Sequence, residues 1–190
     1  MSSLDAFRTI YRLKSISRFA TVDDRHESAA EHSWSSLVLA DWIINESKID
    51  IDRLRVYELI MYHDLVEIHA GDTPIDPDIK DQHKTEIAQL KREEDAFHKL
   101  IKELPISLSK KYKSLHAEDI EYKSLESRFA KAIEQLDAEL HEMDYKKDWA
   151  GWTEEFLRKK KTKYFKDFPL IMELFEEEIK YLHKNGFFTK

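Results

Sequence analysis

Cysteine is absent from the sequence, which excludes disulfide bonds and thiolate chemistry. This absence is consistent with a reducing compartment, and the N-terminus lacks the apolar stretch of a signal peptide. No apolar run approaches the ~20 residues that are needed to span a bilayer, so we expect no membrane partner. Together these absences lead us to expect a cytoplasmic protein.

Glycine and proline are scarce, with three and four residues respectively in a chain of 190. These numbers are too low for the many tight turns of an all-β fold. Apolar residues make up 42% of the chain and charged residues 36%, a balance typical of long amphipathic helices around one core. We see no internal repeat and no linker. The sequence therefore predicts an all-α fold with a single domain over residues 1–190.

An excess of positive charge is also lacking, because the formal net charge is −7. Non-specific binding to nucleic acid needs a basic surface, so we expect no nucleic-acid partner. A small phosphorylated substrate is still compatible with an acidic chain if a metal ion or a local cationic group offsets its charge.

Helical periodicity and terminus signals predict the order of the elements. Ser28 with Glu31 forms a capping-box pattern, Asp50 or Asp52 is a candidate N-cap, and Gly71 follows a helix end. The polar residues 17–28 are expected to form a loop, and Lys159–Lys161 a solvated helix end. A segment with Trp149, Trp152 and Phe156 is expected either to cover the core or to form an interface. The predicted helices run over residues 4–16, 29–47, 53–69, 79–103, 107–115, 118–143 and 168–184.

Two segments carry groups that suit metal chemistry. The first is Ala30-Glu31-His32-Ser33 within an apolar helix, and the second is His63-Asp64 with Glu67 one helical turn later, followed by Gly71-Asp72-Thr73-Pro74. Imidazole and carboxylate groups together suit Mn, Co, Fe, Ni or Zn. Taken alone, the first segment is more often a core histidine and the second a helix end with solvated acids.

In combination, the two segments resemble the HD superfamily. The resemblance is to the branch of small 5′-nucleotidases that act on deoxyribonucleoside 5′-monophosphates. Arg18-Phe19 stands at about the position of that branch's Arg-Trp pair, and Ser124-Leu125-Glu126 with Phe129-Ala130-Lys131 matches its last ligand-bearing helix. The similarity covers residues 10–142, leaving 143–190 as a helical tail.

The resemblance implies an HD-domain helical bundle with a site for one divalent metal ion between the helices. It implies that His32, His63 and Asp64 are metal ligands. Glu67 and Asp72 match the family's acid–base groups, in an order that the sequence leaves open. Arg18 matches a phosphate-binding arginine, and Phe19 matches an aromatic residue beside the sugar. These roles suit a phosphomonoester, whose negative charge the metal and Arg18 would offset.

The chain departs from the family pattern at two positions. His26 replaces a usual proline, and we expect it to be a loop residue. Counting without gaps from Lys131 places Glu134 where relatives have a fourth, aspartate ligand. We expect Glu134 to be that ligand, with Asp137 as the alternative, because a gap inside the helix would rotate its apolar stripe.

Other readings of the same pattern stay open. A hydrolase of nucleoside di- or triphosphates would need more basic groups than the scattered ones between residues 12 and 84. The Gly-Tyr-Pro signature of cyclic-dinucleotide hydrolases is absent. A catalytically silent nucleotide-binding or interaction module is favoured only by the altered fourth ligand. The resemblance also suggests a homodimer.

Overall fold

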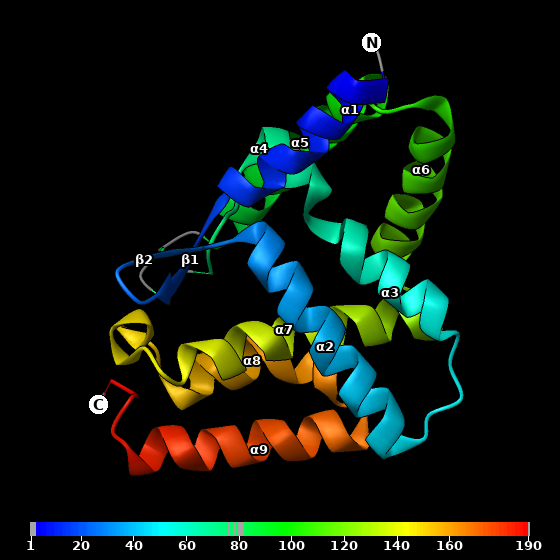
Figure 1. The fold of residues 1–190 in the computed structure, drawn as a ribbon. Coiled ribbons are helices and arrows are strands. Elements are labelled where there is room, and N and C mark those ends of the chain that lie inside the picture. Colours follow the sequence, from blue (N-terminus) through cyan, green and yellow to red (C-terminus); the bar gives the residue numbers. More distant parts are fainter. Residues whose placement is uncertain (1–2, 76, 78, 80–81, 190) are drawn as a thin grey trace.

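The computed structural model describes residues 3–75, 77, 79 and 82–189, and it confirms the predicted all-α class. Helices make up most of the described chain, and a small two-stranded hairpin lies between the first helical segment and α2 (Ala29–Ser47) (Figure 1). The elements are α1 (Ser3–Ile10), η1 (Tyr11–Ser15), β1 (Ser17–Val22), β2 (Arg25–Ser28), α2 (Ala29–Ser47), α3 (Arg53–Tyr62), η2 (His63–Val66), α4 (Glu67–Ala70), α5 (Gln82–Glu103), α6 (Ile106–Glu121), α7 (Leu125–Glu142), η3 (Lys146–Trp149), α8 (Glu154–Phe165) and α9 (Pro169–Lys184), the η elements being 3₁₀ helices.

The main core lies where α2, α3 and α7 pack against one another and α8 and α9 cover them. Trp149 and Trp152 are buried in this core, so the aromatic segment of the tail covers the core. Burying such large apolar side chains stabilises the fold, at roughly 1.5–3 kcal/mol for each fully buried side chain. Within the described residues, no helix combines the length and the apolarity needed to cross a bilayer.

Local signals in the sequence fix the ends of the helices that carry the site. The capping box of Ser28 and Glu31 is confirmed at the start of α2. Asp52 caps α3 by accepting a hydrogen bond from the backbone N–H of Arg55. The helix expected to continue to His69 instead tightens into the 3₁₀ turn η2 at His63, and it ends at Gly71, whose φ of 73° suits glycine.

The expectation of a loop over residues 17–28 was wrong, because this segment forms the antiparallel hairpin β1–β2. Asp148, which lies 127 residues later, binds both the backbone N–H and the hydroxyl of Thr21. These long-range hydrogen bonds hold an otherwise polar strand in place. The hairpin matters for function because it carries Arg18 and Phe19.

Several predicted boundaries also need correction. The helix predicted over residues 118–143 does not begin until Leu125, because Ser124 caps α7. Residues 118–121 therefore belong to α6 rather than to the long helix. The predicted start of the 79–103 helix lies partly outside the described residues. Helix α8 was not predicted, and the expectation of a solvated lysine run fails at Lys161, which is only 3% exposed.

Lys161 belongs to a buried charged cluster between α7, α8 and α9. Its ammonium group lies 2.6 Å from Glu139 Oε1 and donates to the Gln135 side chain at 2.9 Å. Glu178 is also buried, and neither of its oxygens has a hydrogen-bond partner among the described residues. Burial, reinforced by Glu139 and opposed by Lys161, raises the pKa of Glu178 well above its ordinary value.

This raised pKa predicts a pH-dependent stability. A carboxyl group that binds its proton more tightly when folded stabilises the fold at low pH, and that stability is lost as the pH rises toward its folded pKa. We expect the free energy of unfolding, measured by urea denaturation, to fall less steeply between pH 5 and pH 8 in Glu178→Gln than in the wild type. The exposed neighbour variant Glu177→Gln should keep the wild-type slope. Equal slopes in all three proteins would contradict the prediction.

Candidate metal centre

Three of the predicted ligands come together at one place. One nitrogen or oxygen from each of His32, His63 and Asp64 lies within 4.8 Å of the others, a spacing that could hold a metal ion. His32 comes from the first turn of α2, while His63 and Asp64 are consecutive in η2. The packing of α2 against the α3–η2 segment therefore creates the cluster.

The cluster has the chemistry of a metal site as well as its spacing. His63 Nε2 lies 2.8 Å from Asp64 Oδ1, yet neither this nitrogen nor Asp64 Oδ2 has a hydrogen-bond partner among the described residues. Buried polar atoms are nearly always hydrogen-bonded, so two neighbouring residues with such unpartnered atoms point to a ligand. Two imidazoles with a carboxylate form a donor set that suits a first-row divalent metal. These residues therefore fit the metal that the sequence predicts.

Both histidines are anchored through Nδ1. His63 Nδ1 lies 2.6 Å from the Ile60 carbonyl oxygen, which can only accept, so this nitrogen carries the proton. His32 Nδ1 lies 2.9 Å from Asp137 Oδ2. In each ring the other nitrogen, Nε2, is therefore the one left for a metal ion.

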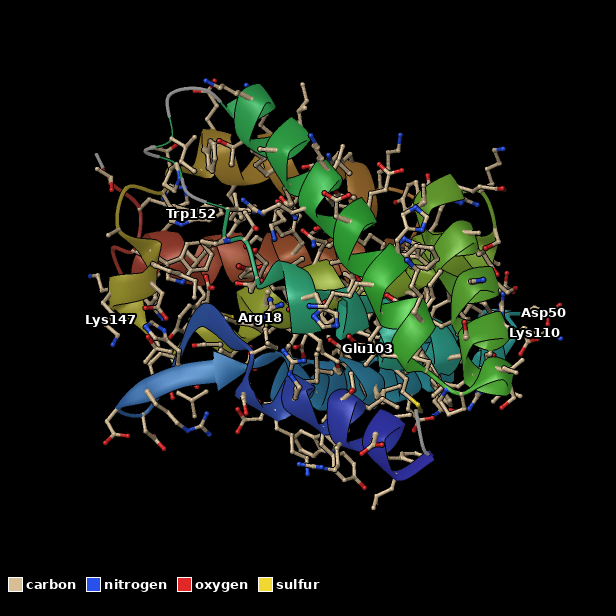
Figure 2. The ribbon with its side chains drawn as sticks, turned by 90° about the horizontal axis from the view of Figure 1, so that it is seen from above. Arg18, Asp50, Glu103, Lys110, Lys147 and Trp152 are labelled. Atoms are coloured by element: carbon tan, nitrogen blue, oxygen red, sulfur yellow. The ribbon has the colours of Figure 1, made fainter. Side chains whose placement is uncertain are left out.

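Arg18 extends from β1 to the same cluster. Its guanidinium lies 3.6 Å from Asp64 and 3.8 Å from Asp72, with Glu27 on its other side at 3.3 Å. Figure 2 shows Arg18 toward the middle of the molecule, whereas Lys110 and Lys147 lie near its edges. The structure thus brings Arg18 beside the predicted metal ligands.

The two predicted acid–base groups lie next to Arg18. Asp72 accepts hydrogen bonds from the Phe19 backbone N–H and from the Glu67 side chain. Burial, together with Asp64 and Asp72, raises the pKa of Glu67 to about 9. Phe19 contributes its backbone to this arrangement, while its side chain is 52% exposed and its ring centroid lies 6.3 Å from that of His26.

The surroundings of the two histidines shift their pKa values in opposite directions. Burial, assisted by Arg18, lowers the pKa of His32 to about 4, so this ring is neutral near pH 7. Burial also acts to lower the pKa of His63, but Asp64 and Glu134 outweigh it and raise that pKa to about 10. His63 in turn keeps the pKa of Asp64 below its ordinary value despite burial.

Glu134 and Asp137 occupy different surroundings. Glu134 Oε1 lies 3.9 Å from His63 Nδ1, and its other oxygen accepts a hydrogen bond from Lys131 at 3.0 Å. Asp137 contacts His32 instead. Neither belongs to the close group of His32, His63 and Asp64. The identity of a fourth protein ligand therefore stays a prediction.

Three further residues, to which the sequence analysis assigned no role in the site, contact this set. Glu27 pairs with Arg18, Lys131 pairs with Glu134, and Ser35 donates to Asp137. Ser35 lies one turn after His32, and Lys131 lies one turn before Glu134, so helical spacing could have pointed to both. The contact of Glu27 with Arg18 depends on the pairing of β1 with β2, which was not predicted.

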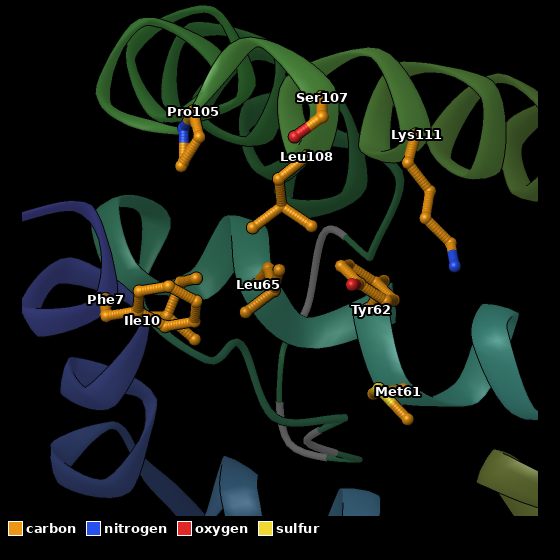
Figure 3. A pocket seen from close by; sticks show the side chains of 9 residues that line it. All are labelled: Phe7, Ile10, Met61, Tyr62, Leu65, Pro105, Ser107, Leu108 and Lys111. Atoms are coloured by element: carbon orange, nitrogen blue, oxygen red, sulfur yellow. The ribbon is translucent and has the colours of Figure 1, made fainter. Parts of the chain in front are cut away.

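An apolar pocket of about 600 Å³ lies between α1, the α3–η2 segment and α6 (Figure 3). Tyr62 and Leu65, which flank His63 and Asp64 in the sequence, face Leu108 of α6 there. The lining contains neither a histidine nor a carboxylate. The chemistry of the cluster therefore lies outside this pocket.

Comparison with known proteins identifies the family of this chain. A family model described as HD domain matches residues 10–172. The chain belongs to the HD-domain family. The resemblance expected from the His32 and His63-Asp64 segments is thereby confirmed.

Individual relatives are more distant. Human 5′-deoxynucleotidase HDDC2 is 28% identical over 147 residues, which cover 76% of this chain and 68% of the human protein. The crystal structure of a predicted metal-dependent phosphohydrolase from Magnetospirillum magnetotacticum has a TM-score of 0.74 and 27% identity, covering 100% of this chain and 97% of that one. An HD-domain phosphohydrolase from Listeria innocua, with a TM-score of 0.64 and 19% identity, covers 97% of this chain and 87% of its own and shows the shared fold.

Removal of one ligand should abolish metal retention by this HD domain. We expect His63→Ala and Asp64→Ala, after loading with Mn²⁺ or Co²⁺ and gel filtration, to keep little metal while their far-ultraviolet circular dichroism stays helical. The control is His183→Ala, which removes an exposed histidine that pairs with Glu154 on α8. Wild-type metal content in either ligand variant would contradict the assignment.

Proposed function

We propose that this HD-domain protein is a metal-dependent phosphohydrolase that converts nucleoside 5′-monophosphates, deoxyribonucleotides in particular, to nucleoside and phosphate. The observation that carries the proposal is the position of Arg18, whose largely buried guanidinium lies within 4 Å of both Asp64 and Asp72. A phosphate-binding group beside a candidate metal site is what a phosphomonoesterase requires.

The roles of the residues follow from their chemistry. Arg18 would bind phosphate oxygens through charge-assisted hydrogen bonds and orient the group for in-line attack. His32, His63 and Asp64 would hold the metal, which when bound supplies Lewis acidity and positive charge. Glu67 and Asp72 share a hydrogen bond, so one can hold a proton for the leaving sugar oxygen while the other accepts one from water.

The substrate class rests on two supports. Human HDDC2, a relative of modest identity, is a 5′-deoxynucleotidase. The resemblance to the HD superfamily also matches Phe19, which follows Arg18 in β1 and has an exposed ring, to an aromatic residue beside the sugar. We therefore favour a monophosphate over di- and triphosphates, which need further cationic groups for their additional charge.

A nucleotide panel tests this proposal. Metal-loaded protein would be assayed for inorganic phosphate release from ribo- and deoxyribonucleoside 5′-monophosphates, 3′-monophosphates, diphosphates and triphosphates, with Mn²⁺, Co²⁺ or Mg²⁺. We expect 5′-monophosphates to be the best substrates and chelation to abolish turnover. No turnover of any nucleotide by metal-loaded protein would contradict the enzyme assignment. Preference for di- or triphosphates would contradict the substrate class.

The role of Arg18 can be tested by a single substitution. Loss of a charge-assisted contact costs ~1.5–3 kcal/mol, so Arg18→Ala should raise the KM for its best monophosphate about tenfold or more. Arg53→Ala is the matched control, since Arg53 pairs with Asp41 on the outer surface. Steady-state kinetics with an unchanged KM in Arg18→Ala would remove Arg18 from the phosphate site.

A further inference from the structure

Asp137 and His32 form a buried contact between two helices. His32 in α2 is 2% exposed and Asp137 in α7 is 7% exposed. The 2.9 Å distance between His32 Nδ1 and Asp137 Oδ2 is that of a good hydrogen bond. Because a carboxylate can only accept, this contact places the proton of the neutral imidazole on Nδ1.

Ser35 fixes the same carboxylate oxygen. Its hydroxyl donates to Asp137 Oδ2 at 2.7 Å, while its distances to the carbonyl oxygens of Glu31 and His32 are longer, at 3.2 and 3.1 Å. A serine hydroxyl has one proton, and the shorter bond to a charged acceptor is the stronger one. Asp137 Oδ2 is therefore held by two donors that lie one turn apart on α2.

We propose that Asp137 and Ser35 are positioning residues that hold the His32 ring with Nδ1 protonated and Nε2 free to bind the metal. The inference rests on the metal-dependent function proposed above. A carboxylate on the far nitrogen of a ligating histidine fixes the ring's orientation and makes it a better donor. At the corresponding nitrogen of His63, the hydrogen-bond acceptor is the neutral carbonyl of Ile60 at 2.6 Å, and the Glu134 carboxylate is farther away, at 3.9 Å.

The two acids of α7, Glu134 and Asp137, have different roles at this site. Asp137 acts through His32, and Asp137 Oδ2 already accepts hydrogen bonds from His32 Nδ1 and from the Ser35 hydroxyl. Glu134 lies on the side of His63 and pairs with Lys131. Loss of Asp137 should therefore weaken metal binding without removing a metal ligand.

The tautomer of His32 can be read in metal-free protein. Nitrogen-15 NMR of histidine-labelled protein at pH 7, with the His32 signals assigned from a His32→Gln variant, should show the Nδ1–H form in the wild type. Asp137→Ala removes the acceptor, and we expect the population to shift toward Nε2–H. Ser33→Ala is the control, because the Ser33 hydroxyl donates to the Ala29 carbonyl rather than to Asp137, and its loss should leave the tautomer unchanged.

Cobalt binding gives the second measurement. By calorimetry, Asp137→Ala should bind Co²⁺ about 10- to 100-fold more weakly than the wild type, and Ser35→Ala should be weakened less. Asp137→Asn keeps the side-chain volume and should also bind more weakly if the alanine variant fails to fold. At saturation, the visible absorption of bound Co²⁺ should be the same in the wild type and in the Asp137 variants, because the ligands are unchanged.

The outcomes separate this inference from the proposed function. Wild-type protein that binds no Co²⁺ would overturn both, whereas Asp137 variants with wild-type affinity and an unchanged His32 tautomer would overturn only the positioning role. An altered Co²⁺ spectrum in the variants would show that Asp137 is itself a ligand, which would also overturn that role.

Discussion

The carboxylates around His32 and His63 can be buried only because cationic or proton-carrying groups face them. An uncompensated buried charge costs several kcal/mol, and Asp64 and Asp72 lie near enough to Glu67 to raise its pKa. Arg18 offsets part of this charge through its contacts with Asp64 and Asp72. In metal-free protein, the raised pKa values of Glu67 and His63 favour their protonated forms, which lowers the negative charge of the cluster. A divalent cation would replace this compensation with a stronger one.

The surrounding fold can be understood from this requirement. The β1–β2 hairpin delivers Arg18, and it is held by the hydrogen bonds between Thr21 and Asp148. Capping at Ser28 fixes the start of α2, and therefore the first-turn position of His32. The 3₁₀ turn η2 directs His63 and Asp64 toward the same point. Each of these elements thus positions a buried polar or charged group that would be unfavourable in isolation.

The sequence predicted the features that depend on local signals. The helix start at Ser28, the cap at Asp52 and the end at Gly71 each follow from the conformational preferences of a few neighbouring residues. The motif also predicted the proximity of His32 to the His63-Asp64 pair, which the structure shows.

The features that could not be predicted from the sequence depend on contacts between residues far apart in the chain. The strands at 17–28 are stabilised by a residue 127 positions away, and the burial of Lys161 depends on Glu139 of another helix. The bond between His32 and Asp137 joins residues 105 positions apart, so periodicity alone gave it no signal. Glu134 was placed by counting along the helix, but its role depends on how α7 faces His63.

The central claim is that His32, His63 and Asp64 together hold one divalent metal. Anomalous diffraction from crystals grown with Mn²⁺ tests it most directly. We predict one strong anomalous peak within bonding distance of a side-chain nitrogen of each histidine and a carboxylate oxygen of Asp64. A fully occupied Mn²⁺ elsewhere, with no peak between these three side chains, would contradict the account.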